Sequence, residues 1–453
     1  MTSRAFRKGS ALIACTIFLV VFIALAVGMA TMSGANLQMA GNQREANAAF
    51  ASAESGLEVV RYWVDRIRMP SSTPVADYLS TAVANLQTVL AANGIENLQI
   101  NSDGSIPTVV IEALTGQSFS GQVSIDPNDP AVLRVLVIGT SHSSARSIRV
   151  NFRIEPYKFP IFNYGMATKG ALQFPQNPTL TAMTESWEAD IYVESANNVM
   201  AVTIGGNTNF AGDIDIGNPL GNVSFGGSVK IGGETGQHAI DDHITIGADP
   251  VEFPEPNVYD FKKYATGPAL DSTHVYNGAG ETLPNALIRA GTNPTFTGNG
   301  AITIQGILYV EAPNVVTFSK QVALQGLIVA EPNPGPNALN FGGNFASTGY
   351  PSGSQFDAIR QEQGSSILAP GSAVTFTGNF SSVNGVLAAG SLYFSGNCAA
   401  TIKGTMISYS SDPTVVNGNI SMNFDRAQMV EIPAGFDLLR VLKYDPASYA
   451  VVF

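Results

Sequence analysis

Apolar residues are concentrated in one long stretch near the start of the chain, and this stretch predicts a membrane-spanning helix. No charged residue occurs between Lys8 and Arg44. As a helix, residues 11–30 alone would span about 30 Å, the thickness of the hydrocarbon layer of a bilayer. The helical pattern then continues without a proline until Pro70. We therefore expect one helix over 10–69, with its first half in lipid and its second half in water.

The second half of this helix is amphipathic. Its apolar residues recur at alternating four- and three-residue spacings, which places them on one stripe of the helix surface. The stripe consists of Ala46, Phe50, Ala53, Leu57, Val60, Val64 and Ile67. The stripe is either an assembly seam between subunits or the core of a head domain, and we expect its lower half to serve the filament and its upper half the head. Charged residues occupy the other faces, and Glu54 among them is a candidate subunit contact.

Residues 70–158 combine a helical pattern with a period of two, which predicts an α+β head. Residues 74–93 carry apolar side chains at helical spacing. Residues 132–138 and 148–154 alternate apolar and polar side chains, as the strands of an antiparallel sheet do. Two further short apolar runs supply partner strands. A long helix lying on this sheet is the expected arrangement.

Residues 159–435 contain a degenerate repeat, and this repeat predicts a parallel β-solenoid. The sequence Ile304-Gln305-Gly306-Ile307-Leu308 returns 20 residues later as Leu324-Gln325-Gly326-Leu327-Ile328. A phenylalanine followed two positions later by glycine recurs at Phe210, Phe225, Phe296, Phe341, Phe376 and Phe394. A period near 20 with short apolar runs and Gly or Asn turns is typical of stacked coils. Residues 253–287 and 355–367 lack the repeat and are expected to be loops.

The segment before the apolar helix is short, basic and ends in glycine. It contains Arg4, Arg7 and Lys8, followed by Gly9. A secretory signal has a shorter apolar core and is cut beyond it, and a plain membrane anchor is not cut at all. A prepilin leader is instead cut before the apolar run, and the junction of Gly9 and Ser10 has this form. Residues 39–57 distinguish among the secretory signal, the plain anchor and the prepilin leader.

Residues 39–44 (MAGNQR) and 53–57 (AESGL) resemble the N-terminal signature of PilX-type minor pilins of type IV pili. They are also similar to the corresponding minor pseudopilins of type II secretion systems. The resemblance extends over residues 4–63. It implies a leader of residues 1–9, cleavage between Gly9 and Ser10 by a prepilin peptidase, and assembly with other pilins or pseudopilins.

One departure from most major pilins is informative. These carry a glutamate four residues after the first residue of the mature chain, and that place is Ala14 if cleavage follows Gly9. PilX-type and tip pseudopilin groups share this absence. A carboxylate within lipid is costly unless it meets a partner charge, such as the amine of a neighbouring subunit. A subunit that begins a filament has no earlier neighbour, so the absence predicts a position at or near the tip.

Composition and charge exclude several other classes. Charged residues make up 13% of the chain, with 45 Gly and 25 Pro, which favours a turn-rich β architecture over a helical enzyme. The net charge is −12, and the basic residues form no tract outside the leader, which argues against nucleic acid as a partner. Cys15 and Cys398 are expected in different compartments, so we predict no disulfide between them.

Two short acidic motifs are the candidates for chemistry in the solenoid. Asp241-Asp242-His243 has residue types used by β-helix proteins that cleave acidic polysaccharides, but the other motifs of those enzymes are missing. The run from Asp213 to Asn218 is compatible with a calcium-binding turn. We predict no catalytic site, no cofactor and no metal, and keep calcium at that run as the alternative.

The sequence thus predicts a leader (1–9), a transmembrane and amphipathic helix (10–69), an α+β head (70–158), a β-solenoid (159–435) and a C-terminal tail (436–453). The basic leader places the N-terminus in the cytoplasm and the rest of the chain beyond the inner membrane. We expect a non-enzymatic minor pilin or pseudopilin that presents its solenoid for adhesion or assembly, towards a surface glycan or protein. A membrane-tethered β-helix protein that binds or cleaves polysaccharide is the alternative.

Overall fold

The computed structural model describes residues 8–95, 98–274, 280–333, 335–396, 398–418, 420–436 and 439–452. The chain divides into two compact units. The first comprises residues 1–157 together with 438–453, and the second comprises residues 158–437. The second unit is therefore inserted into the first.

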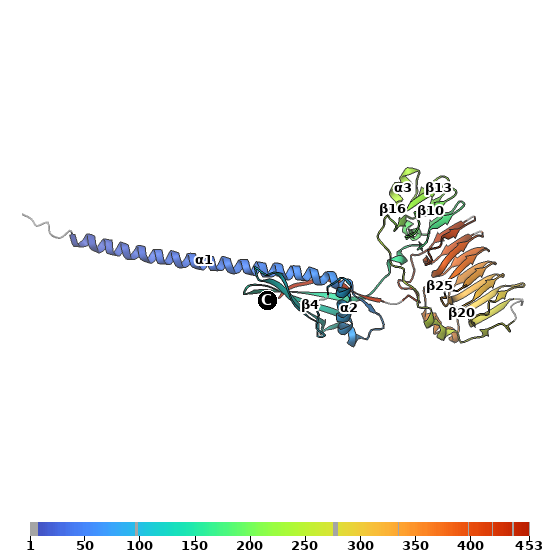
Figure 1. The fold of residues 1–453 in the computed structure, drawn as a ribbon, viewed down its shortest axis with the longest axis horizontal. Helices are drawn as coiled ribbons and strands as arrows, with labels where there is room; N and C mark the ends of the chain where they lie inside the picture. The colour runs from blue at the N-terminus through green and yellow to red at the C-terminus, as the bar shows by residue number, and fades with distance from the viewer. Residues whose placement is uncertain are drawn as a thin grey trace, which may run out of the picture. The chain divides into compact units, whose positions relative to one another are not determined.

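The first unit contains a long helix, a short one and a six-stranded sheet (Figure 1). Its helices are α1 (Lys8–Val64), the 3-10 turn η1 (Val75–Asp77) and α2 (Tyr78–Ala92). Its strands are β1 (Arg68–Pro70), β2 (Ser105–Glu112), β3 (Gln117–Asp126), β4 (Asp129–Ser141), β5 (Ser144–Pro156) and β32 (Leu439–Val452). The strand order is β1-β32-β5-β4-β3-β2, with antiparallel neighbours throughout.

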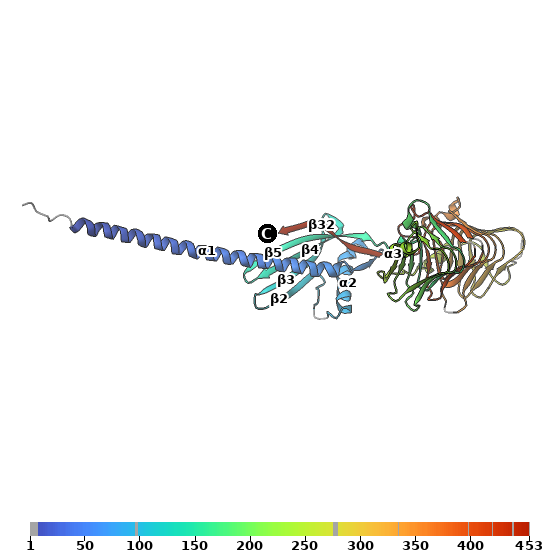
Figure 2. The same ribbon diagram turned by 90° about the horizontal axis from the view of Figure 1, so that it is seen from above.

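The second half of α1 lies along one face of this sheet (Figure 2), and glycines set its distance from the strands. A methyl group added at Gly139 of β4 would lie 2.2 Å from the carbonyl oxygen of Ala49 and 2.2 Å from the amide nitrogen of Ala53. One added at Gly56 of α1 would lie 2.5 Å from the ring of Phe119. The helix and the sheet therefore touch backbone to backbone at one point and backbone to ring at another.

The final segment of the chain is a strand and not the tail that the sequence predicted. β32 pairs with β5 from Arg440–Pro156 to Val452–Ser147, and with β1 through Met69–Arg440. Leu442 is buried in the core of the head. The prediction was wrong because β32 and β5, neighbours in the sheet, are separated in sequence by the whole second unit, and a single strand at the end of a chain carries no repeat or turn signal.

The second unit is the predicted β-solenoid. Its described strands form one continuous 26-stranded sheet. Their bounds, from the first coil onwards, are β6 (Met166–Thr168), β7 (Leu172–Phe174), β8 (Thr179–Ala182), β9 (Ile191–Val193), β10 (Met200–Ile204), β11 (Asn209–Phe210), β12 (Ile214–Ile216), β13 (Asn222–Phe225), β14 (Lys230–Ile231), β15 (Glu234–Thr235), β16 (Ile244–Ile246), β17 (Ala269–Leu270), β18 (Glu281–Ile288), β19 (Thr295–Phe296), β20 (Ile302–Val310), β21 (Val315–Phe318), β22 (Val322–Ala330), β23 (Ala338–Phe341), β24 (Phe345–Thr348), β25 (Ser365–Phe376), β26 (Phe380–Val383), β27 (Val386–Phe394), β28 (Cys398–Ile402), β29 (Met406–Ser408), β30 (Thr414–Val416) and β31 (Ile420–Phe424). Its helical segments are η2 (Pro160–Asn163), η3 (Ser186–Ala189), α3 (Gln237–His243), η4 (Tyr259–Tyr264), η5 (Ser354–Phe356) and η6 (Ile359–Gln361).

The repeat in the sequence corresponds to the stacking of the coils. Gln305 pairs with Gln325 in the parallel register of β20 and β22, and their side chains hydrogen-bond at 3.0 Å. One column of buried rings runs through Phe296, Phe318, Phe341, Phe376 and Phe394, with neighbouring centroids 4.9–5.2 Å apart. Phe318 belongs to this column although no glycine follows it. Phe210 and Phe225 have the sequence motif but pair elsewhere in the stack.

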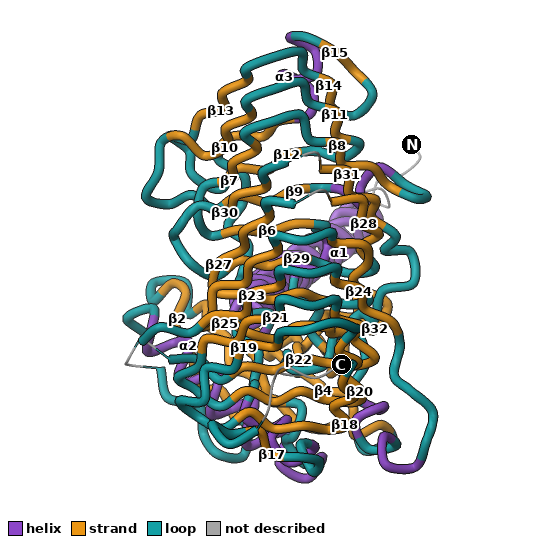
Figure 3. Tube along the Cα trace, turned by 90° about the vertical axis from the view of Figure 1, so that its right-hand side faces the viewer, coloured by secondary structure: helices purple, strands orange, loops and turns teal. Residues whose placement is uncertain are grey.

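The coils are not stacked in chain order. The chain starts near the middle with β6, β7 and β8, and winds towards β16. It then crosses to the other end of the stack, where β17 begins the remaining coils, and winds back. The last coil, β29 to β31, pairs in parallel with the first coil, β6 to β8 (Figure 3). Both ends of the unit therefore meet inside the stack, as an insertion between two neighbouring strands of another sheet requires.

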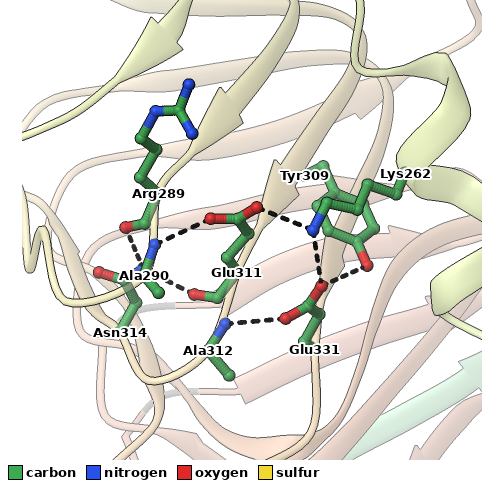
Figure 4. A network of polar contacts seen from close by, with 8 residues as sticks. All are labelled: Lys262, Arg289, Ala290, Tyr309, Glu311, Ala312, Asn314 and Glu331. Carbon is green, nitrogen blue, oxygen red and sulfur yellow. Dashed lines mark hydrogen bonds and ion pairs between the residues drawn. The ribbon is translucent and has the colours of Figure 1, made fainter.

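The crossing segment lies in the stretch that the sequence predicted to be a loop, although β18 of the same stretch belongs to a coil. The segment is held to the coils by Lys262 of η4 (Figure 4). Its ammonium group lies 2.8 Å from Glu311 Oε1 and 3.6 Å from Glu331 Oε1, and the Tyr309 hydroxyl donates to Glu331 at 2.9 Å. Glu311 is the main cause of the raised pKa of Lys262, and Lys262 correspondingly lowers the pKa of Glu311.

A buried arginine joins the segment that enters the solenoid to the segment that leaves it. Arg426 follows the last coil, and its guanidinium group donates to the carbonyl oxygens of Phe162 and Asn163, which precede the first coil. Burial lowers the pKa of Arg426 to about 10, with the Asp190 and Glu188 carboxylates acting in the opposite direction. The rings of Phe162 and Phe436 also meet, at a centroid distance of 4.9 Å. These contacts hold the two connections of the unit side by side.

Candidate functional site

The first half of α1 carries a continuous run of exposed apolar side chains. Each large apolar side chain from Leu12 to Met39 is 48–72% exposed. The helix is long and apolar enough to cross a membrane. The hydroxyl groups of Thr16 and Thr31 donate to the helix carbonyls of Leu12 and Val27, at 2.6 and 2.7 Å. These polar groups are therefore satisfied within the helix, as a lipid environment requires.

The leader lies at the limit of the described residues. α1 begins at Lys8, and Arg4 and Arg7 lie outside the described residues. Gly9 and Ser10 fall in the first turn of the helix, where the side chains are not described. Ala14 is exposed on the apolar half, and the first acidic residue beyond it is Glu45. Cleavage at this junction stays a prediction.

The predicted assembly seam is, for most of its length, the core of the head. Ala53, Leu57, Val60, Val64 and Ile67 are at most 5% exposed and lie in one cluster with residues of β3, β4 and β5. The seam interpretation is wrong for these five residues, because the sheet already covers them. Phe50 packs partly against the same cluster. Ala46, at the lower end of the stripe, is half-buried.

Glu54 is exposed, but it already has a neighbour within the chain. Tyr449 of β32 lies close to Glu54. Burial is the main cause of the raised pKa of the Tyr449 hydroxyl, and the Glu54 carboxylate is the second cause. Glu45, nine residues closer to the apolar half, accepts a hydrogen bond from the Ser143 hydroxyl at 3.3 Å. A role of Glu54 in contact with another subunit stays a prediction.

Residues 8–58 match the family model described as PilX N-terminal. The chain therefore carries a PilX-type pilin N-terminal region. A search of curated proteins gave no match. Among solved structures, the competence-associated pilin ComZ from Thermus thermophilus matches at 11% identity and a TM-score of 0.22. That match covers 90% of this chain and 97% of the other.

The PilX-type region has two structural roles in this chain. Its first part is the exposed apolar half of α1, and its last turns lie under the sheet of the head. Gly56, within the AESGL motif, is one of the two glycines at the closest approach of helix and sheet. The motif identified the region in the sequence. No sequence pattern predicted that Gly56 packs against Phe119 or that Gly139 contacts the helix.

The two acidic motifs of the solenoid meet at one pair, His243 and Asp213, whereas Asp241 and Asp242 have partners of their own. Asp241 accepts from Gln237 at 2.8 Å, Asp242 lies 4.0 Å from His238, and His243 lies 2.7 Å from Asp213. The three residues of the motif thus face three different partners. Among the described residues, no group of three or more His, Cys, Asp or Glu side chains is arranged to hold a metal ion. Calcium at residues 213–218 stays an untested alternative.

Asp190, on the coil next to Asp213, gives a prediction about pH. Burial, assisted by the Asp213 and Asp215 carboxylates, raises its pKa from 3.8 to about 6. Between these values the folded chain holds this proton more tightly than the unfolded chain, so stability falls as pH rises through this window. Asp190→Asn cannot ionise, and its amide oxygen still accepts from the Asp213 backbone as Asp190 does. At pH 7 we expect the variant to be more stable by about 1 kcal/mol, after allowance for solvent screening.

Urea unfolding of the solenoid at several pH values checks this prediction. The gain over the unmodified protein should be absent near pH 4 and should develop by about pH 7. Asp249→Asn, at an exposed carboxylate in the same unit, is the matched control and should show no such gain. A gain for Asp190→Asn that is the same at all pH values would contradict the role of ionisation.

Proposed function

We propose that this chain is a non-enzymatic minor pilin or pseudopilin that enters a filament by its PilX-type region and carries the solenoid as its exported domain. The observation that carries the proposal is the exposed apolar half of α1, within the segment that matches the PilX N-terminal family. Exposed apolar side chains over this length need lipid or other helices around them. A filament of pilin-type helices supplies both in turn, first the membrane and then the neighbouring subunits.

The position of the subunit is the finer part of the proposal. Ala14 stands where most major pilins have a glutamate, so this helix has no carboxylate to meet the amine of an earlier subunit. A large inserted solenoid is also difficult to repeat along a closely packed shaft. Both features support a place at or near the tip, where the solenoid serves adhesion or assembly. The partners are then other pilins or pseudopilins, the prepilin peptidase and the inner membrane.

Processing by a prepilin peptidase tests the assignment. Co-expression with the peptidase should shorten the chain by the nine residues of the leader and expose Ser10 as the new N-terminus, measured by intact mass. Gly9→Ala should block cleavage, because Gly9 is the residue that ends the proposed leader. Gly28→Ala, farther along the same helix and with open space around it, is the control and should be cleaved normally. An uncut native chain would refute the assignment.

Labelling of assembled filaments tests the tip position separately. Gold particles directed against an epitope in the solenoid should lie at filament ends. Uniform labelling along the shaft would contradict the tip position and leave the pilin assignment intact.

A further inference from the structure

A polar groove lies on the solenoid where several of its coils turn. It encloses about 660 Å³ at the corner that follows β24, β26, β28 and β31. Two loops line it from outside the stack, one containing Tyr350 and Arg360 and the other Gln428. The groove lies entirely within the second unit.

Glycines make the floor of the groove. Gly326, Gly364 and Gly385 line it, all at positive φ, between +88° and +144°. A methyl group at Gly385 would lie 2.6 Å from the backbone of Gly364, and one at Gly404 would lie 2.3 Å from Gly385. The coils therefore stack at this corner through bare backbone, and no side chain of these glycines fills the groove.

One wall of the groove consists of one side chain from each of three successive coils. Asn384, Lys403 and Asp425 occupy the same corner on three successive coils, since each follows a strand in the parallel series β26, β28 and β31. From Gly326 to Asp425 the groove crosses four coil spacings, about 19 Å at the usual distance between strands. A site that extends over four coil spacings fits a linear polymer better than a compact ligand.

The charges of the groove are already compensated. Lys403 lies 3.5 Å from Asp425, and Arg360 lies 3.0 Å from Asp357. The Gln363 amide nitrogen already donates to the Arg360 carbonyl oxygen at 3.2 Å, and the Thr348 hydroxyl donates to the Leu324 carbonyl oxygen at 3.4 Å. The exposed groups that remain for a ligand are the side-chain amides of Asn384 and Gln428 and the side-chain oxygen atoms of Gln363 and Thr348. Amides and paired charges offer donors and acceptors in alternation, which hydroxyl groups match and which a run of like charges does not.

We propose that this groove binds an uncharged polysaccharide chain that lies along the solenoid axis. The ligand donates and accepts through its hydroxyls to the three amides and to the Lys403–Asp425 pair. An anionic polymer gains little here because the two cations are paired and the whole chain carries a net charge of −12. An apolar peptide finds few partners, since Met429 and Val430 lie at one end only of a polar wall. The inference deepens the proposed adhesive function by naming the class of its ligand.

Binding of defined oligosaccharides to the full-length protein tests the proposal. The protein is held in a detergent without a sugar headgroup, so that the detergent does not compete. Neutral glucan, mannan and galactan oligomers of increasing length are the probes, with oligogalacturonate, DNA and an extended apolar peptide for comparison. We expect a neutral series to bind, with affinity rising with length until the chain spans the groove.

Two variants locate the binding. Asn384→Trp fills the middle of the groove from an exposed position and should weaken binding at least tenfold. Gln428→Ala removes one hydrogen-bonding partner and should weaken it about three- to tenfold. Gln321→Trp, at an exposed position elsewhere on the solenoid, should change neither affinity nor thermal unfolding. If Asn384→Trp has the same thermal unfolding midpoint as the unmodified protein, its loss of binding is not caused by a loss of fold.

Failure of the inference differs from failure of the proposed function. Binding of none of the neutral series, preference for the anionic probes or the peptide, or normal binding by Asn384→Trp would each overturn the glycan proposal. A protein that is cleaved after Gly9 and enters filaments, yet binds no glycan, retains the pilin assignment. Conversely, glycan binding by a chain that the peptidase never cuts would support the groove and refute the pilin assignment.

Discussion

Ending the chain after Phe436 should unfold the head and leave the solenoid folded. This truncation removes β32, which lies between β1 and β5 in the sheet. Its loss exposes the ring of Phe152, which packs on Tyr444 at a centroid distance of 5.7 Å, and removes the cation–π contact of Arg61 with the same tyrosine at 4.6 Å. The solenoid has its own core and its own end-to-end contacts through Arg426, so it does not depend on this strand.

Hydrogen exchange resolved by segment measures the effect. Amides of β4 and β5 should lose protection in the truncated protein, whereas amides of β20 and β22 should keep it. The point variant Leu442→Lys should reproduce the loss, because an unpaired charge at a 2%-exposed site costs about 4 kcal/mol or more. Lys443→Gln, the adjacent exposed position on β32, should be nearly neutral. Full protection of β4 and β5 without β32 would show that the strand is dispensable.

This prediction has a consequence for folding. The head receives its last strand after the complete solenoid has been synthesised, because β5 ends at Pro156 and β32 begins at Leu439. The contact of Arg426 with the carbonyl oxygens of Phe162 and Asn163 holds together the two connections that lead to these strands. A chain whose solenoid fails to close should therefore also fail to complete the head that holds α1.

Gly139→Ala should destabilise the head by about 3 kcal/mol or more. The new methyl group would stand 2.2 Å from the backbone of α1 at both Ala49 and Ala53, and a helix backbone cannot move locally to make room. The sheet must then separate from the helix along much of the buried stripe. Urea unfolding followed by the fluorescence of Trp63, which packs against this core, measures the loss.

The matched control is a glycine on the helix itself. Gly41 lies in α1 with nothing within 4 Å of the place where a methyl group would stand. Gly41→Ala should therefore leave the head intact and stabilise the helix by about 0.5–1 kcal/mol, since alanine has the higher helix propensity. Equal effects of the two substitutions would show that close approach at Gly139 does not limit the packing.

Residue pattern was sufficient wherever structure depends on neighbours along the chain. The charge-free run after Lys8 determined a long exposed helix, and the MAGNQR and AESGL motifs identified the PilX-type region. The repeat of Ile304–Leu308 at Leu324–Ile328 determined the solenoid, because residues that stack in register must resemble one another. These signals are local or periodic, and a sequence displays both directly.

Tertiary structure decided what depends on contacts between distant segments. It assigned the stripe from Ala53 to Ile67 to the head core, because residues of β3, β4 and β5 pack against it, and the spacing of the stripe alone does not identify its packing partner. It also showed that the last coil of the solenoid stacks on the first coil. The repeat length does not reveal this, because similar coils can stack in any order. Tertiary structure also gathered the groove from loops and corners that are unrelated in sequence. The helix and the repeat were properties of the sequence. The closed insertion and the groove arise from the fold.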